Sequence, residues 1–255
     1  MDVDLSKKVA LVTGAGRGNG RAIATTLAAN GAKVVVNDIE RGPAEETVTA
    51  ITENGGSAHT IAADITDEAA VEAMVEETEQ KYGNVDILVN NAGVSGAAPM
   101  IAEPDDELWS NHLETHLWGS IYCIKHVLSG MTEQEYGKII NITSIHTKNG
   151  VGFTPQYDVA KFGLLGLTKN LALELGQFGI RVNAVAPGHA KTRMTADLSP
   201  TQRERITDQN PLGRFAEPEE IAEAAAFLAA PASDYINGHE LRVDGGQAPI
   251  VSFQE

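Results

Sequence analysis

Short apolar runs alternate with longer amphipathic runs along the whole chain. The short runs are rich in β-branched residues and lie at 9–13, 33–38, 57–64, 85–93, 138–144, 180–188 and 240–246. Between them apolar residues recur every three or four positions, which predicts helices such as 21–31, 67–83 and 157–176. Strands that are apolar throughout are typical of a parallel sheet covered on both faces. The pattern therefore predicts an α/β fold, a single-domain doubly wound parallel sheet (Rossmann-like) with helices on both faces over residues 1–255.

The charge and the single cysteine narrow the class of protein. There are 35 acidic and 19 basic residues, giving a net charge of -16, which argues against a surface for nucleic acid or anionic membranes. We see no signal-peptide pattern at the start and no run near the roughly 18 apolar residues of a membrane span. Cys123 lies in an apolar stretch, which predicts a buried thiol in a reducing compartment. We expect a cytoplasmic protein without nucleic-acid or membrane partners.

A glycine-rich turn follows the first predicted strand and leads into a helix. It reads TGAGRGNG over residues 13–20, a TGxxxGxG spacing and not GxGxxG. Glycines let the backbone approach a pyrophosphate, whose charge then meets the N–H groups at the helix start. A purely structural corner is the alternative. The flanking strand and helix favour a dinucleotide site, with predicted cofactor contacts from Gly14, Arg17, Gly18, Asn19 and Gly20.

Asp38 ends the second predicted strand, 18 residues beyond Gly20. A carboxylate there accepts hydrogen bonds from the adenosine ribose hydroxyls and repels a 2'-phosphate, which favours NAD over NADP. An ordinary loop aspartate is the alternative. Arg17 and Arg41 keep NADP open as the less favoured cofactor, because either guanidinium is able to contact a 2'-phosphate.

Tyr157 and Lys161 stand four residues apart and so share one face of a predicted helix. Tyrosine has an ordinary pKa near 10, and a nearby ammonium favours its phenolate and lowers that pKa. The pair would then serve acid–base chemistry near neutral pH. A chance pair on a solvated helix face is the alternative when the pair is taken alone. Ser144, 13 residues upstream at the end of a predicted strand, supports the catalytic interpretation.

With these motifs in order, the chain resembles the classical short-chain dehydrogenase/reductase family along nearly its whole length. The matching features are TGxxxGxG at 13–20, Asp64, NNAG at 90–93, Ser144, YxxxK at 157–161, PGHAKT at 187–192 and VDGG at 243–246. The resemblance implies that Tyr157 donates and accepts the proton. It also implies that Lys161 lowers the pKa of Tyr157 and binds the nicotinamide ribose, and that Ser144 binds the substrate oxygen.

The resemblance also implies further cofactor contacts. Asp64 would contact the adenine, and Ile65, Asn91, Ala92 and Gly93 would line the cofactor site. Pro187, Gly188 and Thr192 would flank the nicotinamide. The implied activity is hydride transfer between NAD(H) and a secondary alcohol or ketone, with Tyr157 as acid/base. The alternatives are an NADP-dependent 3-oxoacyl reductase-type enzyme, a noncatalytic nucleotide-binding relative, and a relative that dehydrates or epimerises sugars.

Two positions depart from the family pattern. Asn19 replaces an aliphatic residue, with little consequence because the phosphate contact is made by the backbone. His116 stands where the family commonly has an asparagine that helps a proton relay. Asn111 cannot replace it, since five residues of α-helix turn about 140° away. His116 is either a structural replacement or a member of the relay. His112 and His116 have a metal-like spacing, but without a third ligand we expect no metal.

Substrate selection is expected in the loops after the fourth, fifth and sixth strands. Ser144 and Tyr157 would contact the substrate, and His146 and Phe153 either line the pocket or lie on a surface loop. The polar stretch of about 189–215 is predicted to form a lid that excludes water. The resemblance implies a homotetramer or homodimer, with interfaces formed by the helices near 105–130 and 155–178. The second helix indicates an additional buried face, with core packing as the alternative use of its leucines, Leu164, Leu165, Leu167, Leu171 and Leu175.

Overall fold

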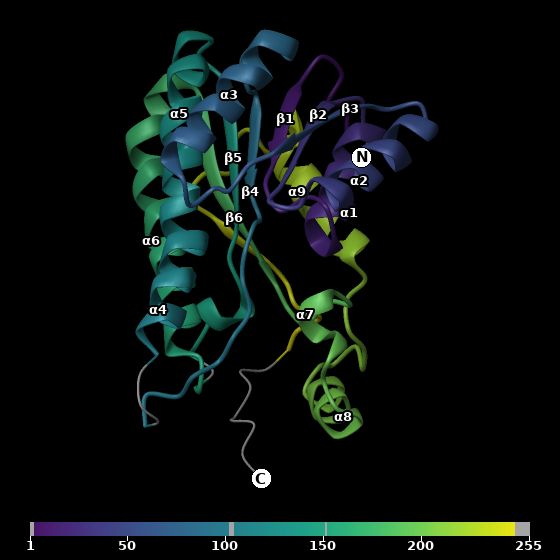
Figure 1. Ribbon diagram of the computed structural model, residues 1–255, viewed down its shortest axis with the longest axis vertical. Helices are drawn as coiled ribbons and strands as arrows, with labels where there is room; N and C mark the ends of the chain where they lie inside the picture. Colours follow the sequence, from purple (N-terminus) through teal and green to yellow (C-terminus); the bar gives the residue numbers. More distant parts are fainter. Residues whose placement is uncertain (1–2, 102–104, 151, 248–255) are drawn as a thin grey trace.

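A seven-stranded sheet runs through the computed structural model, which describes residues 3–101, 105–150 and 152–247. The other residues of the predicted 1–255 domain lie outside the described residues. Every neighbouring pair is parallel, in the order β3-β2-β1-β4-β5-β6-β7 (Figure 1). The strands are β1 (Val9–Val12), β2 (Lys33–Asp38), β3 (Ser57–Ala62), β4 (Ile87–Asn90), β5 (Gly137–Ile142), β6 (Ile180–Pro187) and β7 (Glu240–Val243). The strand order reverses between β1 and β4, and in open α/β sheets the ligand-binding crevice lies at the carboxyl ends of the strands at such a point.

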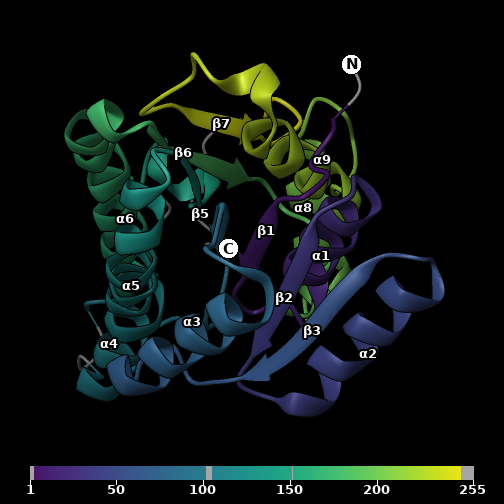
Figure 2. The same ribbon diagram turned by 90° about the horizontal axis from the view of Figure 1, so that it is seen from above.

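Helices cover both faces of the sheet, as Figure 2 shows from above. One face packs against α1 (Gly18–Ala29), α2 (Arg41–Glu53) and α9 (Pro218–Ala229). The other packs against α3 (Glu68–Tyr82), α5 (Gly119–Glu133) and α6 (Pro155–Leu175). Alternate residues of β1 supply the two cores: Ala10 and Val12 belong to the first, and Leu11 to the second. The predicted doubly wound, single-domain fold is therefore confirmed.

The predicted strands are all present, but several end earlier than their apolar runs. The run 85–93 contributes only β4, because the backbone N–H groups of Asn91 and Ala92 turn away to the Thr13 hydroxyl, at 3.0 and 3.1 Å. The residues after the strand thus belong to the crevice instead of the sheet. This shift brings the NNAG motif against the glycine-rich turn.

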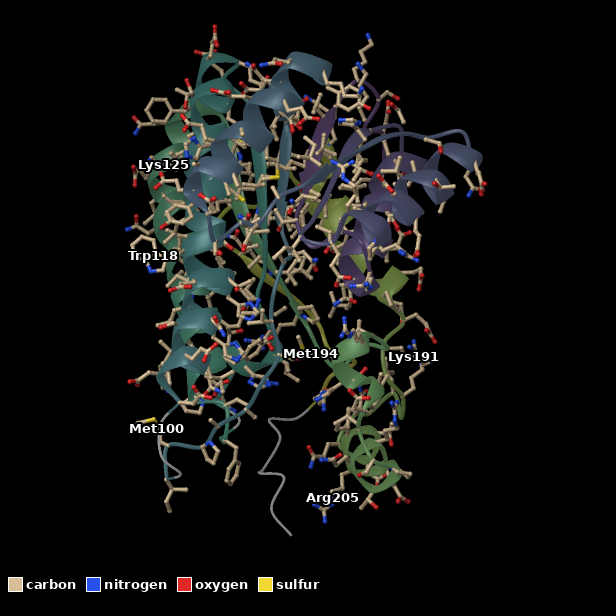
Figure 3. The ribbon with its side chains drawn as sticks, viewed as in Figure 1. Met100, Trp118, Lys125, Lys191, Met194 and Arg205 are labelled. Atoms are coloured by element: carbon tan, nitrogen blue, oxygen red, sulfur yellow. The ribbon has the colours of Figure 1, made fainter. Side chains whose placement is uncertain are left out.

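The helix that carries His116 is not a regular α-helix. It consists of α4 (Asp106–Leu113), a π-helical turn (Glu114–Trp118) and α5. The wider turn departs from the regular rotation assumed for Asn111 and His116. Asn111 is nevertheless exposed while His116 is buried, so the conclusion that Asn111 does not take its place holds. Trp118 ends the π-helical turn on the outer surface (Figure 3).

The two ends of the stretch predicted to form a lid lie side by side. Ala190 and Ala216 form a parallel bridge, and the Lys191 amide donates to the Ala216 carbonyl at 2.9 Å. Between these points lie α7 (Arg193–Ala196) and α8 (Pro200–Asp208); Lys191 and Met194 mark the start of the stretch in Figure 3. A segment whose ends are fixed side by side is suited to move as a unit, and the lid remains a prediction.

Core packing within one chain accounts for the surplus leucines of α6. Leu164, Leu165 and Leu175 are buried, while Leu167 and Leu171 are half-buried against the second core. These leucines therefore give no argument for a second copy, and the oligomeric state remains a prediction. Cys123 is fully buried, which raises the pKa of its thiol to about 12. Within the described residues, no helix has the length and apolar character needed to cross a membrane.

Candidate active site

The glycine-rich turn leads into the start of α1, whose first backbone N–H groups have no acceptor within the helix. Gly14 and Gly18 have φ of 60° and 52°, a region that favours glycine, and the turn leads directly into α1. No side chain caps the start of this helix, and its first turn has no acidic residue. The donors and the positive end of the helix dipole are therefore available to a pyrophosphate.

Asn91 and Thr13 hold the turn against the end of β4. The Asn91 side-chain amide donates to the carbonyls of Thr13 and Gly14, at 2.9 and 3.1 Å. A Cβ at Gly20 would lie 2.4 Å from that amide nitrogen and 2.2 Å from the Gly14 carbonyl oxygen. Glycine is thus required at position 20 by close packing. Asn91 shapes the turn, and its predicted contact with a cofactor remains a prediction.

Two carboxylates, those of Asp38 and Glu40, lie at the end of β2. Asp38 accepts hydrogen bonds from the backbone N–H groups of Gly16 and Glu40, both at 3.0 Å. Arg17 makes a two-pronged ion pair with Glu40, at 2.7 and 2.9 Å, and this pairing lowers the pKa of Glu40. Arg41 pairs with Glu45 at 3.3 Å. Both arginines that kept NADP open are therefore already paired with carboxylates.

Two predicted cofactor contacts, Asp64 and Ile65, follow the end of β3. Asp64 is exposed, and its carboxylate accepts hydrogen bonds from the Thr66 amide and hydroxyl. Ile65 is buried and packs so tightly on Gly119 that a Cβ there would lie 2.6 Å from its Cδ1. Ile65 thus belongs to the core, and its contact with a cofactor remains a prediction.

Ser144, Tyr157 and Lys161 come together at the ends of β5 and α6. Ser144 begins a short 3-10 helix (Ile145–Thr147) and accepts the His146 amide at 3.2 Å. Pro155 at the start of α6 presets the helical φ, so Tyr157 lies in the first turn and Lys161 one turn later. Burial raises the pKa of Tyr157, and a hydrogen bond with Ser144 opposes that rise. The lowering of this pKa by Lys161 remains a prediction.

Lys161 is a buried cation held by a single described contact. Its Nζ lies 5.6 Å from the centre of the Tyr157 ring and donates to the Ile142 carbonyl at 2.7 Å. Burial lowers its pKa from 10.5 to about 7. The side chain therefore changes charge near neutral pH, where a proton-transfer group is most useful.

This shift predicts an unusual pH dependence of stability. Between about pH 7 and pH 10.4 the unfolded chain keeps the Lys161 proton that the folded chain has lost, so the free energy of unfolding rises with pH. In Lys161→Met that rise, on the order of 4 kcal/mol, should disappear. Urea unfolding at several pH values measures it. The exposed Lys169→Met on the same helix is the control, and parallel curves for the parent and Lys161→Met would contradict the expectation.

His116 lies inward at the centre of the π-helical turn. Its ring meets Tyr157 edge to face, with centres 5.2 Å apart, and a Cβ at Gly93 would lie 2.4 Å from its Cε1. Its Nε2 lies 3.0 Å from the Val94 carbonyl oxygen and 3.3 Å from the Val94 amide nitrogen. Burial and the charge of Lys161 lower its pKa well below 6.5, so the ring is neutral at neutral pH.

His146 reaches Tyr157 from another element. The two ring centres lie 5.0 Å apart, and the His146 Nδ1 contacts the Asp158 carboxylate at 2.5 Å. Phe153 is half-buried with φ of 62°, which is unusual for a residue with a side chain. His146 therefore lies beside the candidate catalytic tyrosine and not on an open surface loop. Its contact with a substrate, like that of Phe153, stays a prediction.

The loop after β6 lies against the glycine-rich turn. Pro187 is buried, and Gly188 approaches Asp244 so closely that a Cβ would lie 2.8 Å from its Cα. At the start of α7 the Thr192 amide donates to the Thr195 hydroxyl at 3.2 Å, and the Thr192 methyl would lie 3.3 Å from a Cβ at Gly18. The stretch 187–192 thus borders the crevice opposite Tyr157. The uncapped start of α1, the Asp38 carboxylate and the stretch 187–192 together fit a nicotinamide dinucleotide.

The sequence pattern missed three residues that the fold brings to this site. His112 is fully buried beside His116, Asp158 orients His146, and Glu40 neutralises Arg17. From the sequence alone, the four-residue spacing of His112 and His116 indicates only a possible pair of metal ligands. Among the described residues, no group of three or more His, Cys, Asp or Glu side chains is placed to hold a metal ion.

The chain is similar to known proteins over nearly its whole length. The family model described as enoyl-(acyl carrier protein) reductase matches residues 14–248. The 3-oxoacyl-[acyl-carrier-protein] reductase of Escherichia coli K12 is 42% identical over 239 residues, covering 94% of this chain and 96% of that protein.

Two solved structures extend the likeness to the fold. A 7α-hydroxysteroid dehydrogenase complexed with NADH and 7-oxoglycochenodeoxycholic acid is 34% identical, covers 98% of both chains and has a TM-score of 0.94. A gluconate 5-dehydrogenase from Burkholderia cenocepacia with NADP and tartrate is 34% identical, covers 96% of both chains and has a TM-score of 0.91. The similar proteins thus differ widely in substrate and in the cofactor they were crystallised with.

Proposed function

Because this chain belongs to the classical short-chain dehydrogenase/reductase family, an oxidoreductase family that binds nicotinamide cofactors, we propose that it transfers a hydride between NAD(H) and a secondary alcohol or ketone. The observation that carries the proposal is the convergence of Ser144, Tyr157 and Lys161 at the edge of the crevice. A noncatalytic nucleotide-binding relative would have little reason to keep a buried lysine beside a buried tyrosine.

The three side chains have separate roles in this proposal. Tyr157 gives a proton to the carbonyl oxygen in reduction and takes one from the hydroxyl in oxidation. The Ser144 hydroxyl donates to the substrate oxygen and holds it at the tyrosine. The ammonium of Lys161 stabilises the phenolate form of Tyr157. A bound nicotinamide supplies or accepts the hydride, and the protein supplies position and charge.

NAD is the proposed cofactor because the end of β2 repels a 2'-phosphate. Asp38 and Glu40 are both anionic there, and Arg17 is occupied by Glu40. The second candidate is an NADP-dependent reductase of 3-oxoacyl thioesters, which the 42% identity with an enzyme of that name favours. We propose that the protein acts on a small molecule and without a membrane partner. We also propose that it forms a homotetramer or homodimer, and light scattering tests this assembly.

A substrate screen tests the proposal. Purified protein is assayed with NAD and NADP against sugars and sugar acids, hydroxysteroids, hydroxyacyl thioesters and simple secondary alcohols, and with the matching ketones in reverse. We expect turnover with NAD in one of these classes. Binding of NADH without turnover of any class would favour the noncatalytic alternative, and turnover of 3-oxoacyl thioesters with NADPH alone would favour the second candidate.

A further inference from the structure

A buried carboxylate from the last strand is hydrogen-bonded to both sides of the candidate catalytic serine. Glu240 is the first residue of β7, and its side chain is only 9% exposed. Its Oε1 accepts hydrogen bonds from the Thr143 hydroxyl at 2.9 Å and from the Thr147 hydroxyl at 2.6 Å. Thr143 directly precedes Ser144, and Thr147 ends the 3-10 helix that Ser144 begins. One carboxylate oxygen thus joins the two segments that flank the serine.

The strand between Glu240 and the serine has small side chains on the relevant face. Glu240 pairs with Ala184 of β6, and Arg242 pairs with Ala186, in the parallel register. Paired residues of neighbouring strands point to the same face, and both alanines are fully buried. The Glu240 side chain is therefore able to cross β6 and reach the end of β5, where its two partners lie 97 and 93 positions away in the sequence.

The second oxygen of Glu240 is held by Arg242. The Nη2 of Arg242 donates to the Oε2 of Glu240 at 2.8 Å, from two residues along the same strand. Burial of a carboxylate costs free energy unless the group is paired and hydrogen-bonded, and here both oxygens have partners. Hydrogen bonds to a charged acceptor are roughly twice as strong as those between neutral groups. Glu240 is thus a firm anchor for the two threonine hydroxyls.

Both threonines also contact the backbone around Ser144. The Thr147 amide donates to the Ser144 carbonyl at 3.0 Å, and the Thr147 hydroxyl lies 2.6 Å from the same oxygen. On the other side, the Thr143 amide and hydroxyl both donate to the Val185 carbonyl of β6, at 2.8 and 3.2 Å. The backbone at Ser144 is therefore fixed on both sides, and the direction of its Cα–Cβ bond is fixed with it.

Resting on the function proposed above, we propose that Glu240 is a positioning residue that sets the direction of the Ser144 hydroxyl toward the substrate oxygen. Glu240 does not meet the reacting atoms and acts through Thr143 and Thr147 on the backbone of Ser144. The hydroxyl then needs no reorientation when the carbonyl or alcohol oxygen arrives, and a donor that is already in place is worth most in the transition state. A purely structural tie between β7 and β5 is the alternative.

Removal of the carboxylate should cost rate only while Ser144 is present. Glu240→Val is expected to lower kcat about tenfold, and Glu240→Gln, which keeps the shape and an oxygen acceptor, about threefold, both with an unchanged dissociation constant for NADH. Ser144→Ala alone should lower kcat about a hundred-fold and keep measurable turnover. Adding Glu240→Val to Ser144→Ala should then change kcat by no more than about twofold. The exposed Glu174→Gln on α6 is the control and should behave as the parent does.

A second variant reaches the same network from its other end. Thr147→Val keeps the shape of the side chain and removes its hydroxyl, so it should lower kcat as Glu240→Val does, and it replaces that variant where Glu240→Val fails to fold. A further tenfold loss on adding either change to Ser144→Ala would overturn the proposal, because Glu240 would then act on the enzyme by a route other than the serine. Parental kcat in both single variants would overturn it as well.

A measurement without substrate separates this inference from the proposed function. Amide hydrogen exchange in peptides that cover residues 143–148 should become about tenfold faster in Glu240→Val, because the amides of His146 and Thr147 donate to Ser144 and lose a fixed acceptor. Peptides from α2 should exchange as in the parent. Unchanged exchange at 143–148 would overturn the inference even if the enzyme turns over. Absence of turnover in the parent would instead reject the proposed function, and the role of Glu240 in catalysis with it.

Discussion

Tyr157→Phe is expected to lose about a thousand-fold in kcat while binding NADH as the parent does. The substitution removes the hydroxyl that hydrogen-bonds with Ser144 and leaves the ring, which packs edge to face against His112, His116 and His146. Because these ring contacts persist, the fold and the crevice should be preserved. Steady-state rates with the substrate found in the screen, and fluorescence titration with NADH, measure the two effects.

Tyr235→Phe is the matched control for this experiment. Tyr235 is fully exposed, so loss of its hydroxyl should change neither rate nor binding. A Tyr157→Phe variant within a few-fold of the parental kcat would remove Tyr157 from the chemistry and leave the convergence at the crevice as a structural feature. A variant that loses NADH binding as well would show that the hydroxyl serves the cofactor first.

The sequence predicted the strands well, because a strand that is buried on both faces consists of consecutive apolar residues. Val34, Val35 and Val36 of β2 are all fully buried, since neighbours cover both sides of the sheet, and such runs are visible without any knowledge of the fold. The carboxyl ends of parallel strands share one edge, so Asp38, the last residue of β2, and Ser144, which follows β5, lie at that edge. Their contacts with a cofactor and a substrate stay predictions.

The rest of the site depends on contacts between distant residues. Arg17 and Glu40 are 23 positions apart, and only the pairing of β1 with β2 brings them together. The sequence did not predict the π-helical turn. A wider turn of only five residues leaves the spacing of apolar positions along the helix nearly unchanged. The burial of His112 was not predicted either, because it depends on α4 packing against α6, and the residues next to His112 in the sequence do not show that contact.

The glycine-rich turn and the residues around Tyr157 each pack closely against the segment that follows β4, at Gly20 and at Gly93. Gly93 leaves room for the His116 ring, and Gly20 leaves room for the Asn91 amide. A side chain at either position would collide at 2.4 Å, so the cofactor turn and the acid/base cluster are coupled through β4 and the residues that follow it. Substitutions in the NNAG segment should therefore disturb both binding and catalysis.

The preference for NAD is expected to depend on Asp38 and Glu40, and the double variant Asp38→Asn/Glu40→Gln should largely abolish it. In the parent a 2'-phosphate would meet both carboxylates, and like charges in contact cost several kcal/mol, so we expect roughly a hundred-fold preference in kcat/KM. The variant removes both charges and releases Arg17, whose guanidinium then becomes available to the phosphate. Asparagine retains an oxygen that accepts the Gly16 amide, so the turn should keep its shape.

Ratios of kcat/KM for NAD and NADP at low and high salt measure this change. The parental preference should weaken as salt screens the carboxylates, and the double variant should show little salt dependence. Glu53→Gln, which removes an exposed charge at the far end of α2, is the control and should keep the parental ratio. A double variant that still prefers NAD a hundred-fold would mean that ribose hydrogen bonding or loop shape, and not the repulsion by these two carboxylates, selects the cofactor.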